Sequence, residues 1–549
     1  MKRIIWAFAV VAAAAASPLR AGGLDRPRAL AFIEQCRNAP GRQPNLRLIY
    51  WRLKVCEAAD APFDAAPHRK HVLGLQNGDG GFGLWPKDAS TADGTLAALT
   101  VLAGADPADK PGCVRYLQAL LAAKAKAAKR YSDLIVQRDV HACLMGLSLL
   151  GSDVPGLDGY LKVLEQDGKP WGLYYRITAG RAFNRPLPDR EGWIQKIDAQ
   201  ATEGYLQFLW SGQERHYALE AMHLLGGKFT YDYWIRAGSS RVRRAPDGPA
   251  GLGTLVGMWR TIRTAKLLGV EMPWLAEWLA GSASIQPGPI GGFAAMPGLE
   301  SDPWILPRLA RLLPESIPAP KDVAALAAGW GNKQKDGGYY DTRTERSSRR
   351  FRESDPLTGL IDDTWQAVGA LRVAGTKHKD REALLAWLGE LLEKRREDLD
   401  AQDILRVLEC FEMLGEKPKG AKALATYFQE RFGGDLPGTV RALTLLGAKP
   451  HLPGAGKRLA SMLDRVRVGK VPMELSVLAE TVEALHALGE GYPHAAHFLD
   501  LLGRVQNADG GVCMPGSLHS NLYDTLAAVR MAKLLPDLAV SPAPVRQGP

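Results

Sequence analysis

The chain has 549 residues, of which 46% are hydrophobic and 23% charged, so it can bury two or more domain cores and lacks the composition of a disordered protein. Its formal net charge of +10 favours acidic partners such as anionic polysaccharides, anionic lipids or diphosphate groups. Nucleic acid is the less suitable anionic partner, because the N-terminal segment predicts export.

The N-terminus has the order of a secretory signal. Met1-Lys2-Arg3 precedes an apolar run from Ile4 to Ala16, which Ser17-Pro18 follows. We therefore predict a signal peptide at residues 1–23 and an exported protein, periplasmic or extracellular. No later segment approaches the roughly 18 uncharged apolar residues of a spanning helix, so no transmembrane span is expected.

Six cysteines are too few for a disulfide scaffold in a chain of this size, and none forms a C-x-x-C pair. Isolated buried thiols are the expected state. Pairing of Cys36 with Cys56 in an oxidising compartment stays open.

The rest of the chain repeats one helical signal. Apolar residues recur at helical spacing and the runs end in a Leu-Gly type stop, in which glycine supplies the left-handed residue that closes a helix. These stops end at Gly151, Gly226, Gly269, Gly415, Gly447 and Gly489. Alternating strand patterns are nearly absent, which predicts an all-α fold built of helix pairs.

Proline-rich residues 312–321 cannot continue a helix and are the expected linker between two lobes, 24–311 and 322–539. The Pro- and Ser-rich tail at 540–549 is expected to be disordered.

A Gln-x-x-Asp-Gly-Gly turn occurs three times, once with one residue fewer, and the next helix is expected to open near a threonine. Gln76 precedes Thr95 by 19 residues and Gln506 precedes Thr525 by 19, so the copies form an internal repeat. A degenerate copy runs from Gln286 to Phe293. The turn residues are Gln76, Asp79, Gly80 and Gly81, then Gln334, Asp336, Gly337 and Gly338, then Gln506, Asp509, Gly510 and Gly511. Asp-Gly-Gly provides a tight turn, and the Asp or Thr at the next helix start can cap its amides.

This turn resembles the QW-type repeat of the terpenoid cyclase and protein prenyltransferase superfamily, whose members fold as α/α toroids. The resemblance implies an α/α toroid in which each turn is a structural clip between neighbouring helix pairs. It covers most of the chain and says little about activity, because the superfamily includes enzymes and binding domains.

One signature of class II terpenoid cyclases is partly present. The family's Asp-x-Asp-Asp-Thr motif matches Leu360 to Thr364, in which Asp362 would be the proton donor and Asp363 its neighbour. Adjacent carboxylates can raise one another's pKa and keep one protonated. However, Leu360 replaces the first Asp, and helix capping accounts for Asp363.

Other signatures are weaker or missing. The prenyltransferase zinc pattern Asp-x-Cys is absent, and His141 points away from Asp139 and Cys143 on a helix, so neither a metal nor another cofactor is expected. The thioester motif of complement-like toroids is also absent. Residues 170–193, with Trp85 to Asp88, faintly resemble α/α-toroid pectate lyases, in which arginines and aromatic rings would bind polyuronate.

We call the copy at Gln334 the third copy, because the degenerate copy precedes it. Here Thr364 follows the glutamine by 30 residues, and the longer loop is rich in arginine. An anionic ligand site is therefore predicted there, next to Asp362, formed by Arg343, Arg346, Arg349, Arg350, Arg352 and Trp365. A solvated loop explains the same residues without a ligand.

The leading hypothesis is an exported toroid protein that binds an isoprenoid, an anionic ligand or a protein partner without the superfamily's catalytic motifs. The alternatives are a class II terpenoid cyclase using Asp362 and, more remotely, a polyuronate lyase.

Overall fold

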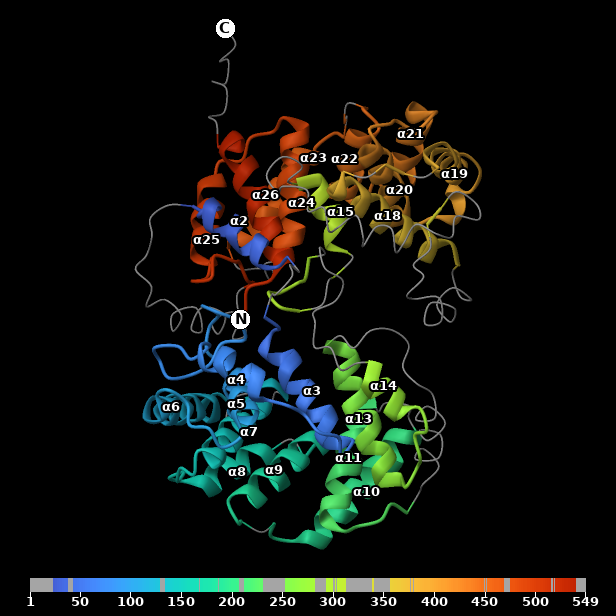
Figure 1. The fold of residues 1–549 in the computed structure, drawn as a ribbon. Coiled ribbons are helices and arrows are strands. Elements are labelled where there is room, and N and C mark those ends of the chain that lie inside the picture. Colours follow the sequence, from blue (N-terminus) through green and yellow to red (C-terminus); the bar gives the residue numbers. More distant parts are fainter. Residues whose placement is uncertain are drawn as a thin grey trace. The chain divides into compact units, whose positions relative to one another are not determined.

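The computed structural model describes residues 23–37, 43–128, 134–206, 212–230, 252–281, 293–312, 338–339, 356–468 and 474–539, apart from breaks of one or two residues. Within these ranges the chain has 22 α-helices, one short 3-10 helix and no strands, only isolated bridges (Figure 1). The all-α fold is confirmed.

The chain forms two compact units, which we call the middle unit, residues 43–286, and the flanking unit, residues 1–42 and 287–549. The division therefore falls near residues 42 and 286, whereas the sequence placed it at 312–321. Residues 313–321 lie outside the described ranges. The N-terminal helix belongs to the unit that contains the C-terminus, which a linear division cannot represent.

Six helices of the middle unit pack on one another in a closed cycle, and we call them its cycle helices. In order they are α3 (Leu46–Ala58), α5 (Ala92–Leu102), α7 (Leu134–Leu149), α9 (Pro170–Ala182), α11 (Gly212–Leu225) and α13 (Leu252–Leu268), which packs back on α3. Four further helices each pack against one cycle helix: α4 (Ala66–Leu73) on α5, α6 (Lys110–Ala128) on α7, α8 (Leu157–Glu165) on α9 and α10 (Arg190–Leu206) on α11. Helix α14 (Leu275–Gly281) follows α13.

The flanking unit repeats this arrangement. Its cycle helices are α15 (Ile305–Leu312), α18 (Pro356–Ala374), α20 (Ala401–Leu414), α22 (Leu436–Leu445), α24 (Leu475–Leu488) and α26 (Leu522–Leu538), which packs back on α15. Against them pack α2 (Arg26–Gln35), α19 (Arg381–Lys394), α21 (Ala421–Phe432), α23 (Ala455–Arg467) and α25 (Ala495–Arg504), with a 3-10 turn at Arg396–Asp398.

The predicted glycine stops are confirmed. All six glycines have a positive φ between 64° and 72°. After Gly415, for example, the N–H of Glu416 donates to the carbonyl of Phe411 at 2.9 Å and closes the last helical turn. Such an end lets the chain reverse at once, which makes short helix pairs possible.

The repeated turn clips two neighbouring elements together through its glutamine. The Gln76 Nε2 donates to the carbonyls of Gly80 (2.9 Å) and Asp109 (3.0 Å), and its Oε1 accepts from the N–H of Asp109 (2.9 Å). Gln506 makes the same three bonds, to Gly510 at 2.8 Å and twice to Asp25 at 2.9 Å.

The last clip explains why the N-terminal helix belongs to the flanking unit. Asp109 precedes α6, and its Oδ1 accepts from the N–H of Gly112, while Asp25 caps α2 through the N–H of Arg28. Helix α2, blue in Figure 1 beside the red α26, therefore takes the place of a helix following α26.

The three threonines hold the turns rather than opening the next helix. The hydroxyls of Thr95, Thr364 and Thr525 accept the backbone N–H of Phe82 (3.1 Å), Tyr339 (2.9 Å) and Val512 (2.9 Å) respectively. The N-caps of the first and last copies are Thr91 and Asn521. In the third copy α18 begins at Pro356, eight residues before Thr364, so Asp363 lies inside a helix and the expected capping role is wrong.

The degenerate copy has one backbone hydrogen bond in common with the first copy. The carbonyl of Phe293 accepts the N–H of Asp302 at 2.7 Å, as that of Phe82 accepts from Thr91 at 3.3 Å. The other predicted residues of this copy, together with Gln334, Asp336, Gly337, residues 1–22 of the predicted signal peptide and the tail, lie outside the described ranges.

Candidate functional site

Asp362 lies on a cycle helix of the flanking unit and forms an ion pair with Arg406 of α20. Their side chains are 21% and 16% exposed, and Arg406 also lies 3.7 Å from Asp403. Burial raises the pKa of Asp362 to about 6; Arg406 opposes this shift, and the carboxylates of Asp403 and Asp363 add to it. Asp362 is therefore a perturbed but paired carboxylate.

The aromatic rings near Asp362 already face a cation. The Arg406 guanidinium lies 5.2 Å from the ring centroid of Trp304 and 5.9 Å from that of Trp365. Such rings would have to face a carbocation in a cyclase, and here the arginine that neutralises Asp362 occupies that position.

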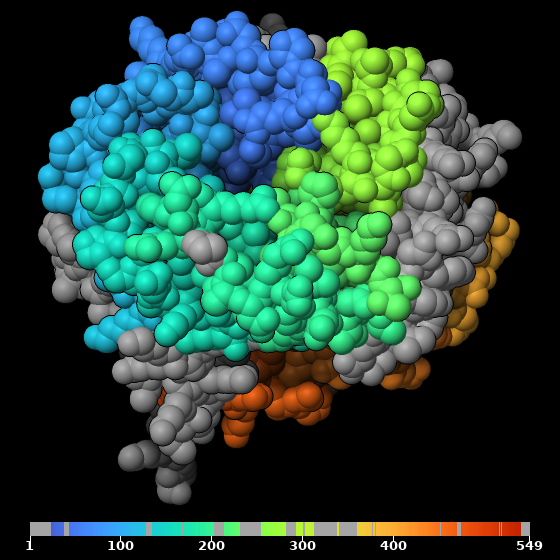
Figure 2. All heavy atoms as spheres, turned by 90° about the horizontal axis from the view of Figure 1, so that it is seen from below, coloured from blue at the N-terminus to red at the C-terminus, as the bar shows by residue number. Residues whose placement is uncertain are grey.

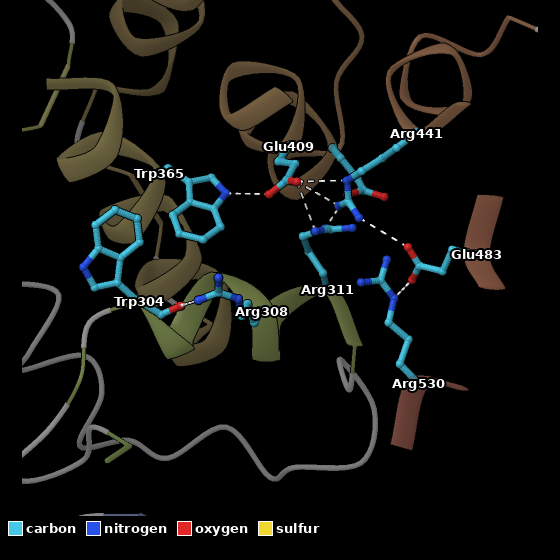
Figure 3. A network of polar contacts seen from close by, with 9 residues as sticks. Trp304, Arg308, Arg311, Trp365, Glu409, Arg441, Glu483 and Arg530 are labelled. Carbon is cyan, nitrogen blue, oxygen red and sulfur yellow. Dashed lines mark hydrogen bonds and ion pairs between the residues drawn. The ribbon is translucent and has the colours of Figure 1, made fainter. Parts of the chain in front are cut away.

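A polar network fills the centre of the flanking unit (Figure 3). Glu409 is 5% exposed and accepts from the Trp365 indole N–H (2.7 Å), while Arg311 (3.1 Å) and Arg441 (2.8 Å) form ion pairs with it. Arg441 and Arg530 also pair with Glu483 of α24. All six cycle helices thus contribute a side chain, and Trp365 is used as a donor inside this network. The five predicted loop arginines, Arg343 to Arg352, lie outside the described ranges.

The middle unit has an aromatic interior instead. Ring contacts run from one cycle helix to the next: Trp51 of α3 to Trp259 of α13 (5.4 Å between centroids), Trp259 to His216 of α11 (4.8 Å), Tyr217 of α11 to Tyr174 of α9 (5.2 Å), and Tyr175 of α9 to His141 of α7 (4.5 Å). Five of the six cycle helices share this chain of rings.

Two tyrosines lie on opposite cycle helices, Tyr50 on α3 and Tyr174 on α9. Burial raises the pKa of Tyr50, and the charges of Tyr174, Asp93, Glu57 and Tyr217 add to the increase. The side chains of Tyr50 and Tyr174 keep partial access to solvent. Figure 2 shows a hollow framed by blue, green and yellow-green atoms of this unit.

The charges of this interior are incompletely balanced. Arg138 pairs with Asp93 at 3.0 Å, and Arg263 forms two bonds with Glu220, which is 1% exposed. Among the described residues, Arg47 and Arg260 have no ion-pair partner. Burial lowers the pKa of Arg47, and the charge of Arg260 adds to the burial that lowers the pKa of His216, which places Arg260 beside the aromatic chain.

The segment at 170–193 contributes rings but not its predicted arginines. Trp171, Tyr174 and Tyr175 belong to the interior, where the Trp171 N–H donates to Gln137 at 3.1 Å. Arg181 and Arg190 instead donate to the last carbonyls of α11, those of Leu224 and Leu225, and so stabilise a helix end.

Trp85 to Asp88 belong to the first turn, because Asp88 Oδ2 accepts from the N–H of Leu84 at 2.9 Å.

Sequence reasoning did not select Arg47, Tyr50, Trp51, His216, Tyr217, Glu220, Trp259, Arg260 or Arg263. Their recurrence at spacings of one, three and four on alternate helices was the available signal.

The described residues contain no group of ligands that could hold a metal ion. Asp139 pairs with Lys124, and His141 lies 2.9 Å from the Thr178 hydroxyl. All six cysteines are free and buried, Cys36 and Cys56 included.

An open groove between the start of α22 and α23 has a volume of about 440 Å³ and is lined by Gly434 to Pro437 with Lys457, Arg458, Ser461, Met462 and Arg465. It has no aromatic lining, and its residues belong neither to the polar network of the flanking unit nor to the ring chain of the middle unit, so the two interiors are the better candidate sites.

No helix in the described part of the chain is long and apolar enough to cross a membrane. No protein-family model matches this sequence, and no curated protein matches it.

Proposed function

We propose that this chain is an exported, ligand-binding protein made of two α/α toroids, and that the interior of the middle unit binds an acidic saccharide. The two closed cycles of helices and the repeated glutamine clips support the toroid assignment. The chain of aromatic rings shared by five of the six cycle helices is the observation that carries the site, together with the hollow that Figure 2 shows in this unit.

The chemistry of this interior favours a saccharide over an isoprenoid. Aromatic rings can cover the apolar faces of sugar rings, while tyrosine hydroxyls and arginine N–H groups bind hydroxyl and carboxylate oxygens. An isoprenoid would leave the Arg47 and Arg260 guanidiniums without a partner in a desolvated site, which is costly. A uronic acid carboxylate would instead pair with them.

The titration properties of the interior favour binding over catalysis. Burial raises the pKa of Tyr50, Tyr174 and Tyr175, so their phenolate forms are scarce at neutral pH. Burial lowers the pKa of His141 and His216 to about 3, which makes both weak bases. A polyuronate lyase needs an effective base beside the sugar carboxylate, and none of these groups has the matched pKa of one.

The test is a titration of the mature protein with oligogalacturonate, followed by calorimetry, with a neutral oligosaccharide as the control ligand. Arg47→Gln and Arg260→Gln should each weaken binding about tenfold or more, because a charge-assisted hydrogen bond contributes about 1.5–3 kcal/mol. Arg115→Gln on α6, whose side chain is 73% exposed, is the matched control and should change nothing.

Tyr174→Phe should weaken binding by about three- to tenfold through loss of one neutral hydrogen bond. Tyr160→Phe on α8 is its control. Absence of oligogalacturonate binding, or binding that neither arginine variant weakens, contradicts the proposal. An unsaturated product formed during the titration would replace it with the lyase alternative.

Export is part of the proposal and rests on the sequence alone. Fractionation of cells producing a C-terminally tagged chain should place a shortened protein outside the cytoplasm. A cytoplasmic protein that retains residues 1–16 contradicts export and leaves the saccharide site untouched.

A further inference from the structure

Arg308 of α15 differs from its neighbours in the flanking unit. Within the described residues, Arg311, Arg406, Arg441 and Arg530 each pair with a carboxylate, whereas Arg308 pairs with none. Its guanidinium donates to the Trp304 carbonyl at 3.1 Å, which is one turn back on its own helix. Arg308 therefore has no ion pair in the described part of the chain.

Arg308 faces the inside of the cycle and still reaches solvent. Its guanidinium lies 4.8 Å from the ring centroid of Tyr523 on α26 and 6.0 Å from that of Trp365 on α18. Helices α18 and α26 are the two cycle neighbours of α15, so a side chain between these rings points inward. Arg308 is nevertheless exposed, which means that the interior is open at this point.

Glu480 of α24 lies within reach of the Arg308 charge. It is exposed, and among the described residues no hydrogen bond or ion pair engages its carboxylate. Burial nonetheless raises its pKa, against the charges of Arg530 and Arg308, while Asp435 and Glu409 add to the increase. Glu480 is therefore a carboxylate with access to solvent and within reach of the Arg308 charge.

Two aromatic rings lie beside the Arg308 guanidinium. Tyr523 is itself held in place, because its hydroxyl donates to Asp302 at 2.6 Å, and Trp304 and Trp365 lie 5.8 Å apart between centroids. The N–H groups of Arg308 that do not bond to the Trp304 carbonyl or the Tyr523 hydroxyl can bind an anion. Trp304 is half-buried and offers a ring surface beside them.

We propose that Arg308, Tyr523 and Trp304 form a second ligand site, in the flanking unit, for the carboxylate or phosphate group of a small ring-containing molecule, with Glu480 as the opposing carboxylate. The guanidinium binds the anionic group and Trp304 contacts the ring. Glu480 accepts from hydroxyl or amine donors of the ligand and repels ligands with a second negative charge. This site is independent of the saccharide site, because none of its residues belongs to the middle unit.

The experiment measures equilibrium binding of benzoate, phenyl phosphate and inorganic phosphate to the mature full-length protein. Arg308→Gln should weaken binding of every probe that binds by about tenfold or more, whereas Glu480→Gln should strengthen it severalfold by removing a repelling charge. Arg504→Gln on α25, an exposed arginine with one ion pair to Asp500, is the matched control and should leave binding unchanged.

Opposite signs for the two site variants distinguish a site from general attraction to a basic protein. The tighter of benzoate and phenyl phosphate identifies the anionic group, and either result supports the site. Arg308 pairs with no carboxylate, so Arg308→Gln should fold normally, which circular dichroism checks. No binding of any probe, an unchanged affinity in Arg308→Gln, or an equal loss in Arg504→Gln overturns the proposal.

Discussion

Gly510→Ala tests the clip that attaches the N-terminal helix to the flanking unit. Gly510 has φ +92°, and a Cβ there would lie 2.4 Å from the Arg28 carbonyl oxygen and 2.9 Å from its carbonyl carbon. The positive φ costs a non-glycine residue about 1–2 kcal/mol. The overlap with backbone adds about 1–3 kcal/mol, because α2 has to move. We therefore expect unfolding free energy to fall by about 2–5 kcal/mol.

The assay is urea unfolding of the mature protein together with amide hydrogen exchange of α2. Gly489→Ala is the matched control: its φ is +71°, but nothing lies within 4 Å of the added Cβ, so it reports the backbone term alone. Gly510→Ala should lower the unfolding free energy more than Gly489→Ala does, and it should raise amide hydrogen exchange in residues 26–35 of α2. Equal losses in the two variants, with α2 still protected, refute the packing argument.

Four further outcomes are expected. Gln506→Ala and Gln76→Ala should each lower the unfolding free energy by about 1–3 kcal/mol, because each leaves backbone groups unpaired. Amide hydrogen exchange should rise in α2 and α6 respectively, and unchanged exchange in both helices contradicts the clip. Thr364→Val should lower the unfolding free energy by about 1–3 kcal/mol, although the loop of the third copy is longer than in the other copies. An unchanged urea midpoint means that the Thr364 hydroxyl does not hold the turn of this copy. Burial raises the folded-state pKa of Asp362 to about 6, so the contribution of this group to stability is complete below about pH 4 and lost as pH rises through 6. Asp362→Asn should therefore flatten the dependence of the unfolding free energy on pH between about pH 4.5 and 6.5. The same dependence in the variant and the wild type contradicts the assignment. Neither the wild type nor Asp362→Asn should convert squalene or a prenyl diphosphate, and turnover that the substitution abolishes would restore the cyclase hypothesis.

Local physics carried the sequence predictions that proved correct. A glycine after an apolar stripe ends a helix wherever it occurs, so the stops at Gly151 through Gly489 could be read without knowledge of the fold. The turns could be predicted from their repetition in the sequence. In each copy a backbone N–H of the turn donates to the threonine hydroxyl, at Thr95, Thr364 and Thr525. The capping role assigned to Asp363 failed because the start of α18 depends on residues that the repeat does not share.

The sequence by itself therefore determined the all-α class, the helix ends and the repeated clip, since each depends on residues a few positions apart. Tertiary structure alone decided the rest. Pairing of Gln506 with Asp25 joins residues 481 positions apart, and no periodicity encodes such a closure. Likewise, the chain of rings from Trp51 to His141 and the contacts of Arg308 with the Tyr523 and Trp365 rings form only when a cycle of helices closes.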